Sequence, residues 1–405
     1  MDLLLKPVPI TSGCTIKISG SKSETNRLLL LQALFPQINI RNISNSDDSV
    51  AMKNAIASKA EVIDIGHAGT AMRFLTAYFA IQQGRKVTLT GSSRMQERPI
   101  KILVDALQQL GADIQYSGKR GFPPLQITGK RISASETTIE ANISSQYISA
   151  LLLIAPKLEN GLRLKLSGEL TSAPYIRMTL GLLNQIGVDT SFEDDEITIK
   201  PGDIKPKTIT VESDWSSASY FYSVIALSDP GASLTLSSFQ EASLQGDSAL
   251  SEIYLNFGVA TTFNEDKITL TKTDIALSEV NFNLKDTPDL AQTIAVTAFG
   301  LGVKCTLSGL HTLAIKETDR LQALESELTK LGAAVKVSAD TIEVIPFSIK
   351  ETIRISTFGD HRMAMAFAPL AIRIPIIIQD AGVVAKSSPE FWDNLKTLGF
   401  SISKT

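Results

Sequence analysis

Apolar and polar residues recur along this chain in one repeated pattern. A segment with helical spacing of its apolar residues ends in Leu, Ile or Phe followed by Gly, and a short strand-like run comes next. Each glycine stands where a helix end favours the left-handed backbone that glycine adopts easily. The pattern occurs five times, with glycines 76, 71, 74 and 67 residues apart: Gly111, Gly187, Gly258, Gly332 and Gly399. A sixth, degenerate copy is indicated between Val50 and Ile65.

The repeat predicts the fold class and the domain organisation. A period of about 70 residues is too long for a solenoid repeat and fits α/β units of two helices and a few strands. Six units group into two domains of three, and a new helix-forming stretch after Glu212 puts the main boundary close to 212. We therefore predict an α/β protein with helices and mixed sheets. A first domain spans 21–212, and a second spans 1–20 with 213–405, completed by the N-terminal strand.

Composition and charge exclude several classes of protein. The 405 residues are 43% hydrophobic, which is ample for two domains, and the net charge of -3 gives no electrostatic footprint for nucleic acid. Two cysteines and three separate histidines make neither a disulfide framework nor a metal-ligand spacing, so no metal is expected. The sequence has no signal-peptide pattern and no apolar run of membrane-spanning length, so we expect a cytoplasmic protein without a membrane partner.

Cations recur where helices are expected to begin. The segment Gly20–Arg27 joins a strand-like run at 15–18 to an apolar helix, and Ser21 or Ser23 can cap that helix. Lys22 and Arg27 stand against the partial positive charge of its N-terminus, which is unfavourable unless an anion binds there. The same arrangement occurs before or at the start of the expected helices 74–81, 99–110, 318–331 and 363–371, with Arg73, Arg98, Arg320 and Arg362.

Hydroxyl and amide side chains add to this pattern. Ser144, Ser145 and Gln146 precede the expected helix 147–155 and offer two hydroxyls and an amide beside a helix N-terminus. One cation at a helix start is ordinary, but several starts of this kind predict a site for a ligand that carries several negative charges.

Three residues are candidates for proton transfer. Asp289 precedes the expected helix 290–299 and is either a plain N-cap or an acid–base residue. Glu317 lies between Lys316 and Arg320 in the chain, where a carboxylate among cations can carry a proton. His361 is either a proton carrier or a capping or solvated histidine.

Taken together, these motifs resemble those of the 5-enolpyruvylshikimate-3-phosphate synthase family, the 3-phosphoshikimate 1-carboxyvinyltransferases. The matching stretches keep family order over nearly the whole chain, and KETDRL (316–321) and DHRMAM (360–365) are the most specific of them. They are Ser21–Arg27, Ala68–Arg73, Arg94–Ile100, Ser144–Gln146, Lys316–Leu321, Asp360–Met365 and Lys386.

The resemblance implies a two-domain enolpyruvyl-transferase fold with three repeated units in each domain. It implies transfer of the enolpyruvyl group of phosphoenolpyruvate to the 5-hydroxyl of shikimate 3-phosphate, in chorismate and aromatic amino-acid biosynthesis. The reaction releases phosphate through a tetrahedral intermediate and uses no metal or organic cofactor. A monomer is expected.

The resemblance also implies roles for individual residues. Asp289 accepts the 5-hydroxyl proton, and Glu317, with Lys22, delivers a proton to the methylene carbon of phosphoenolpyruvate. The implied shikimate 3-phosphate site comprises Ser23, Arg27, Ser144, Ser145, Gln146, Ser172, Tyr175, Asp289 and Lys316. The implied phosphoenolpyruvate site comprises Lys22, Gly69, Arg98, Gln146, Arg320, Arg362 and Lys386.

Three positions depart from the family pattern, and two alternatives stay open. His67 stands where the family commonly has Asn, Phe74 where it often has Pro, and Thr312 where it has a substrate-binding Asn. One alternative is the sister enolpyruvyl transferase acting on UDP-N-acetylglucosamine, which has a loop cysteine near the Arg98 region that is absent here. The other is a nonenzymatic polyanion-binding protein.

Overall fold

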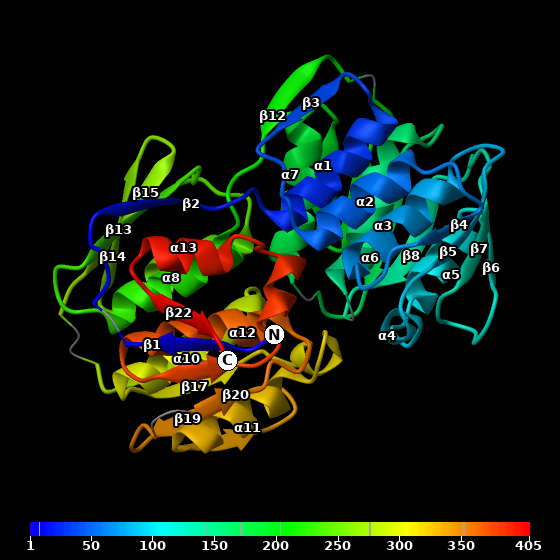
Figure 1. Cartoon of the computed structure of the whole chain (residues 1–405). Coiled ribbons are helices and arrows are strands. Elements are labelled where there is room, and N and C mark those ends of the chain that lie inside the picture. The colour runs from blue at the N-terminus through cyan, green and yellow to red at the C-terminus, as the bar shows by residue number, and fades with distance from the viewer. Residues whose placement is uncertain (8, 143, 171, 203, 275–276, 351–352) are drawn as a thin grey trace. The chain divides into compact units, whose positions relative to one another are not determined.

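The computed structural model describes residues 1–405 except 8, 143, 171, 203, 275, 276, 351 and 352. It divides into two compact units, unit 1 with Met1–Ser19 and Glu212–Thr405, and unit 2 with Gly20–Val211. The borders between the units lie one residue from the domain boundaries expected at 20/21 and 212/213. The α/β class with mixed sheets is confirmed (Figure 1).

One sheet topology recurs through the described chain. In each four-stranded sheet the first two strands are parallel to each other, and the connection between them contains helices. The third and fourth strands each pair antiparallel with their neighbours. In unit 2 the order is β4-β5-β7-β6 and β8-β9-β11-β10. The strands are β4 Val62–Asp64, β5 Lys86–Thr90, β6 Asp113–Tyr116, β7 Leu125–Thr128, β8 Glu136–Glu140, β9 Leu162–Ser167, β10 Thr190–Glu193 and β11 Glu196–Ile199. A parallel pair, β3 Ile38–Arg41 and β12 Lys207–Thr210, completes the unit.

Unit 1 repeats this topology three times, with orders β2-β13-β15-β14, β16-β17-β19-β18 and β20-β21-β1-β22. Strand β2 pairs in parallel with β13, so the segment before Gly20 belongs to a sheet that otherwise begins after residue 212. The strands are β1 Leu3–Lys6, β2 Cys14–Lys17, β13 Ser233–Ser237, β14 Val259–Asn264, β15 Lys267–Lys272, β16 Glu279–Asn283, β17 Lys304–Ser308, β18 Ala333–Val337, β19 Ile342–Pro346, β20 Ile353–Ile355, β21 Ile376–Ile378 and β22 Ser401–Lys404.

Each unit contains three helices that are buried along most of their length. In unit 2 they are α1 Lys22–Leu34, α3 Gly69–Ala80 and α6 Ser145–Ile154. In unit 1 they are α8 Trp215–Leu227, α10 Ala291–Leu301 and α12 His361–Phe367. Helices α3, α8 and α10 carry mostly apolar or small residues on every side, which suits a helix in a core rather than at a surface. Burying a leucine such as Leu28 or Leu30 contributes about 1.5–3 kcal/mol.

The remaining helices expose one side. They are α2 Asp47–Ala57, α4 Ser93–Gln96, α5 Lys101–Gln109, α7 Ala173–Gln185, α9 Leu250–Ile253, α11 Arg320–Leu331 and α13 Phe391–Thr397. The five repeat glycines follow α5, α7, α11, α13 and the 3₁₀ turn Tyr254–Phe257, and all have φ between 71° and 109°. The predicted left-handed helix ends are therefore confirmed.

Helix boundaries differ from the predicted ones for local reasons. Helix α3 begins five residues earlier than expected, at Gly69, because small residues let the first turn form without a side-chain cap. Helix α12 ends at Phe367 and continues as the 3₁₀ turn Ala368–Ile372, since Pro369 has no N–H to donate. Helix α10 is preceded by the 3₁₀ turn Pro288–Leu290, which contains Asp289.

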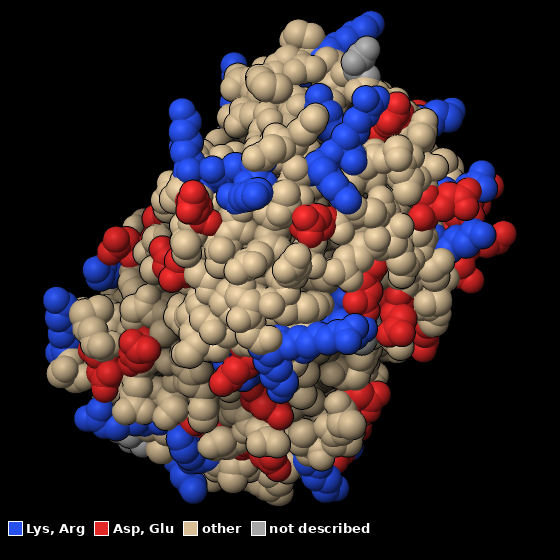
Figure 2. Space-filling view, turned by 90° about the vertical axis from the view of Figure 1, so that its right-hand side faces the viewer, with Lys and Arg blue, Asp and Glu red and all other residues tan. Residues whose placement is uncertain are grey.

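The surface carries charges of both signs. Figure 2 shows acidic and basic side chains interspersed over the face that it draws. Among the described helices, none has the length and apolar character that crossing a bilayer requires.

Candidate active site

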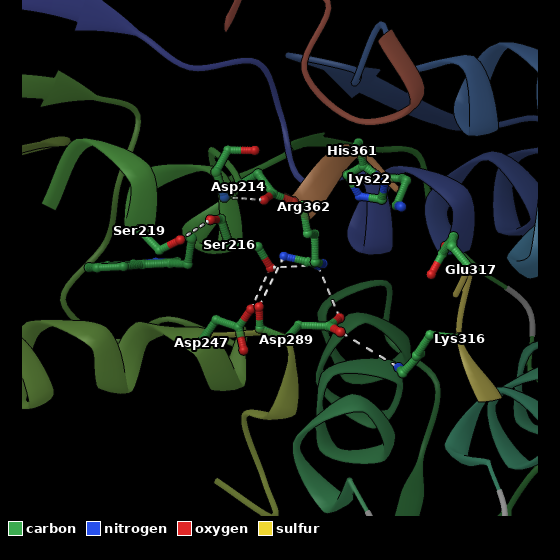
Figure 3. A network of polar contacts seen from close by, with 12 residues as sticks. Lys22, Asp214, Ser216, Ser219, Asp247, Asp289, Lys316, Glu317, His361 and Arg362 are labelled. Atoms are coloured by element: carbon green, nitrogen blue, oxygen red, sulfur yellow. Dashed lines mark hydrogen bonds and ion pairs between the residues drawn. The ribbon is translucent and has the colours of Figure 1, made fainter. Parts of the chain in front are cut away.

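In unit 1 one guanidinium joins the starts of all three buried helices. Arg362 Nη2 donates to Ser216 Oγ in the first turn of α8 at 3.3 Å and to Asp289 Oδ2 before α10 at 3.0 Å. Its Nη1 donates to the Asp289 carbonyl oxygen at 3.3 Å. Because Arg362 itself lies in the first turn of α12, polar groups from three distant parts of the sequence meet there (Figure 3).

Asp289 is surrounded by cations. Besides Arg362, Arg320 Nη1 contacts its Oδ1 at 2.9 Å and Lys316 Nζ lies 3.6 Å away. Burial alone would raise the pKa of Asp289, but Arg362, Lys316 and Arg320 hold it well below its ordinary value. Thr287 and Leu290 take the N-cap positions of the turn and the helix, so the plain N-cap alternative for Asp289 is wrong.

Arg320 is held by three carboxylates, and its side chain is only 2% exposed. Its Nε donates to Asp360 Oδ2 at 2.7 Å, its Nη1 to Asp289 and its Nη2 to Glu317 Oε2 at 2.9 Å. Burial opposes the charge, but Asp360, Glu317 and Asp289 together raise the pKa of Arg320 above its ordinary value. The guanidinium therefore stays charged in the core of unit 1.

Glu317 pairs with Arg320 and Lys386, whereas its sequence neighbours suggest Lys316 and Arg320. Its Oε2 accepts from Arg320, and its Oε1 accepts from Lys386 Nζ at 2.9 Å. Lys316, which precedes it in the chain, contacts Asp289 instead. The structure thus brings together Asp289, Lys316, Glu317, Arg320, Arg362 and Lys386, all predicted site residues of unit 1.

Asp360 and His361 belong to the same cluster. Asp360 is the N-cap of α12, and its Oδ1 accepts from the Arg362 backbone N–H at 2.9 Å. His361 Nδ1 lies 3.5 Å from Asp360 Oδ1, and the ring is buried, so the solvated alternative for His361 is wrong.

Asp247 and Ser216 extend the network, and the sequence did not identify either residue. Ser216 Oγ donates to the Asp247 carboxylate while it accepts from Arg362. Burial, together with the charge of Asp289, raises the pKa of Asp247 to about 7, although Arg362 and Ser216 oppose the rise. Asp247 lies in a 3₁₀ turn at Gly246–Ala249, without a neighbouring cation or motif in sequence to mark it.

In unit 2 Lys22 opens α1 beside a second carboxylate that the sequence did not reveal. Ser21 is the N-cap, and Lys22 Nζ lies 3.7 Å from Asp48 Oδ2 in the first turn of α2. The side chain of Lys22 is 17% exposed and that of Asp48 is 6% exposed. Lys22 and Asp48 therefore form an ion pair at the start of α1 and α2.

Arg27 points into the helical core of unit 2. Its Nε donates to Thr179 Oγ1 at 2.8 Å, its Nη1 to the Ser23 carbonyl at 2.8 Å, and its Nη2 to Ser149 Oγ and the Tyr175 carbonyl. Burial lowers the pKa of Arg27 to about 10, so it remains charged at neutral pH. The guanidinium ties α1 to α6 and α7 close to Ser23 and Tyr175, two other predicted site residues.

The N-terminus of α3 is open and has a cation beside it. No side chain caps this helix, and a Cβ on Gly69 would lie 2.5 Å from Arg98 Nη1. Gln146 Nε2 donates to Thr70 Oγ1 at 3.3 Å, which brings the start of α6 to the start of α3. Free helix amides next to a guanidinium are a suitable binding site for a phosphate or a carboxylate.

Arg73 does not belong to this open site. Its Nη1 donates to the Gly69 carbonyl at 2.9 Å and its Nη2 to the Pro99 carbonyl at 3.4 Å. The Tyr147 hydroxyl donates to the same Pro99 carbonyl at 2.6 Å. Arg73 is therefore a brace for the loop that carries Arg98.

The remaining predicted residues of unit 2 lie at two further helix starts. Ser144 caps α6 by accepting from the Gln146 N–H at 3.3 Å, and Ser145 is buried behind it. Ser172 precedes α7 with φ 55° and ψ 43°, a left-handed conformation that is uncommon for serine and typical of functional sites. His67, the departure from the family pattern, lies 2.9 Å through Nδ1 from Ser92 Oγ.

No group of three or more His, Cys, Asp or Glu with metal-binding geometry occurs among the residues that the structure describes. The described side chains of each unit place cations and helix N-termini, which recognise anions, close to carboxylates, which can carry protons.

Comparison with known proteins gives one consistent family. A family model described as EPSP synthase (3-phosphoshikimate 1-carboxyvinyltransferase) matches residues 49–395. The chain is 45% identical to a 3-phosphoshikimate 1-carboxyvinyltransferase of Bacteroides fragilis over 98% of both chains. It is 35% identical to one of Tolumonas auensis, covering 96% of this chain and 97% of that one.

Solved structures agree at the level of the fold. An EPSP synthase from Acinetobacter baumannii aligns with a TM-score of 0.80 and 21% identity over 100% of both chains. The enolpyruvyl transferase NikO from Streptomyces tendae aligns with a TM-score of 0.73 and 15% identity, covering 100% of this chain and 98% of that one.

Proposed function

This chain belongs to the EPSP synthase family of 3-phosphoshikimate 1-carboxyvinyltransferases, and we propose that it transfers the enolpyruvyl group of phosphoenolpyruvate to the 5-hydroxyl of shikimate 3-phosphate. The observation that carries the proposal is the network in which Arg320, Arg362, Lys316 and Lys386 surround Asp289 and Glu317. Two carboxylates among four cations provide both anion recognition and proton transfer.

The cations of unit 1 fit phosphoenolpyruvate. This substrate carries a phosphate and a carboxylate, and Arg guanidinium groups bind both in a forked geometry. Arg320 and Arg362 are held by carboxylates and have little freedom to move, so their recognition geometry is set before a ligand arrives. Lys386 adds a point charge beside Glu317. Lys22, Gly69, Arg98 and Gln146 of unit 2 are assigned to the same substrate.

Shikimate 3-phosphate is assigned to the hydroxyls and helix starts of unit 2. Ser144, Ser145 and Ser172 surround the N-termini of α6 and α7 and would bind its 3-phosphate. Ser23 and Arg27 would bind its carboxylate, with Gln146 and Tyr175 beside the ring. Asp289 and Lys316 of unit 1 would contact the 5-hydroxyl.

The reaction then needs two proton transfers. Asp289 accepts the proton of the 5-hydroxyl as the oxygen bonds to the central carbon of phosphoenolpyruvate. Glu317 gives a proton to the methylene carbon, which becomes a methyl group, and Lys22 is assigned to the same proton delivery. The tetrahedral adduct afterwards loses phosphate from the central carbon and a proton from the methyl group, which restores the enol double bond.

Phosphate release tests the proposal. The chain is mixed with phosphoenolpyruvate and shikimate 3-phosphate, and in parallel with phosphoenolpyruvate and UDP-N-acetylglucosamine. We expect phosphate release only with shikimate 3-phosphate. Release only with the UDP-sugar would replace the proposal by the sister activity, and release with neither would favour a nonenzymatic role.

A further inference from the structure

The cations of unit 1 are already occupied by carboxylates of unit 1. In this part of the described chain three carboxylates hold four cations: Asp289, Glu317 and Asp360 with Lys316, Arg320, Arg362 and Lys386. An anionic ligand does not meet unpaired positive charge there. It has to compete with an internal carboxylate for the same N–H donors.

Glu317 is the carboxylate best placed to give way. It precedes α11 in the segment after the 3₁₀ turn Leu313–Ile315, and its side chain is 16% exposed. Its two ion pairs join it to side chains, Arg320 and Lys386. Asp360, by contrast, is fully buried and also accepts from the backbone N–H of Arg362 as the cap of α12. Moving Asp360 would remove the cap of α12, whereas Glu317 caps no helix, since the cap of α11 is Asp319.

The cations that hold Glu317 are also the ones assigned to phosphoenolpyruvate. Each of its oxygens contacts one of them at 2.9 Å, so a bound phosphate or carboxylate would replace both contacts. Glu317 would then lose two positive neighbours and gain a negative one, and both changes favour its protonated form. Lys316 precedes Glu317 in the chain, Asp289 contacts Arg320 Nη1, and Asp360 contacts Nε and Nη2 of the same guanidinium.

We propose that phosphoenolpyruvate displaces Glu317 from Arg320 and Lys386, and that Glu317 thereupon takes up from solvent the proton that it delivers to the methylene carbon. The inference rests on the proposed function and adds how its acid is prepared. On binding, the carboxylate of Glu317 gains one proton. In the addition step its O–H bond breaks, a C–H bond forms at the methylene carbon, and the 5-oxygen bonds to the central carbon. Glu317 returns to a carboxylate. Binding of phosphoenolpyruvate has thus produced the protonated Glu317 that the addition step requires.

Calorimetry with phosphoenolpyruvate alone tests this step without turnover. The titration is run at pH 7.5 in two phosphate-free buffers of different ionisation enthalpy, so the difference in heat counts the protons taken up. We expect about one proton per bound phosphoenolpyruvate in the natural chain. In Glu317→Gln we expect no linked proton and about fivefold tighter binding, because the competing charge is gone.

Asp247→Asn is the matched control, because Asp247 is a carboxylate of the same network whose pKa is raised to about 7. This variant should keep the proton uptake. Proton uptake that persists in Glu317→Gln and disappears in Asp247→Asn would overturn the inference. Binding of phosphoenolpyruvate without proton uptake would also overturn it, as would the absence of binding in both the natural chain and Glu317→Gln. If the chain transfers no enolpyruvyl group yet shows uptake that depends on Glu317, the proposed function fails and the displacement stands. Normal transfer with no linked proton refutes the displacement alone.

Discussion

Replacing Asp247 by Asn should stabilise unit 1 at alkaline pH. Asp247 is buried, and burial with the charge of Asp289 raises its pKa to about 7. In the unfolded chain the group ionises at about 3.9, so between these values the folded chain holds a proton that the unfolded chain has lost. The stability from this group is therefore greatest below about pH 4 and decreases as the pH rises to about 7.

The structure sets the size of the effect. A pKa difference of about 3 units corresponds to at most about 4 kcal/mol between pH 4 and pH 8. Asn keeps the oxygen that accepts from Ser216 Oγ, and exchange of this hydrogen-bond partner costs about 1 kcal/mol. Partial relaxation around the charge reduces the gain further, so we expect Asp247→Asn to be about 2 kcal/mol more stable than the natural chain at pH 8.

Urea unfolding measured by tryptophan fluorescence reports the stability of unit 1. Both tryptophans, Trp215 and Trp392, lie in unit 1, the unit that contains Asp247. The stability difference should shrink from pH 8 to pH 5, and the exposed Asp266→Asn should show no such pH dependence. A variant that is less stable than the natural chain at pH 8, or whose difference is the same at both pH values, would refute this reasoning.

Three other changes have clear expectations. Asp289→Asn should lose at least about 100-fold in turnover yet bind shikimate 3-phosphate in calorimetry, since it removes the proton acceptor and keeps the shape of the side chain; near-normal turnover would show that its assigned role is wrong. Gly69→Ala should raise KM for phosphoenolpyruvate with a smaller change for shikimate 3-phosphate, because its Cβ would lie 2.5 Å from Arg98 Nη1; unchanged kinetics would remove Arg98 from the site. Gln292→Met should raise the free energy of unfolding by about 1 kcal/mol, since neither amide atom has a hydrogen-bond partner within the described residues, and a loss of stability would indicate a partner such as a buried water.

The sequence predicted features that repeat or that stand against a local rule. The repeat glycines identify helix ends because only a left-handed residue fits there, and their φ values agree. Lys22, Arg320 and Arg362 were noticeable because cations are unusual at helix starts. The structure places Arg320 and Arg362 together around Asp289 in unit 1.

Other site residues could not be found in this way. Asp247, Ser216 and Asp48 follow ordinary local patterns, and their importance comes from partners that the fold brings to them from far along the chain. The direction of a long side chain is equally hidden from sequence. Arg73 occupies a position near a helix start similar to that of Arg98, yet its guanidinium turns inward to hold backbone carbonyls.

One measurement tests the central claim most directly. Phosphoenolpyruvate labelled with ¹³C at the methylene carbon is incubated with shikimate 3-phosphate and the chain in D₂O, and the products are followed by NMR. The proposed addition and elimination predict a labelled enolpyruvyl ether on the 5-oxygen of shikimate 3-phosphate, with deuterium in its methylene group and free phosphate. Labelled pyruvate without the ether, or unchanged phosphoenolpyruvate, would contradict the account.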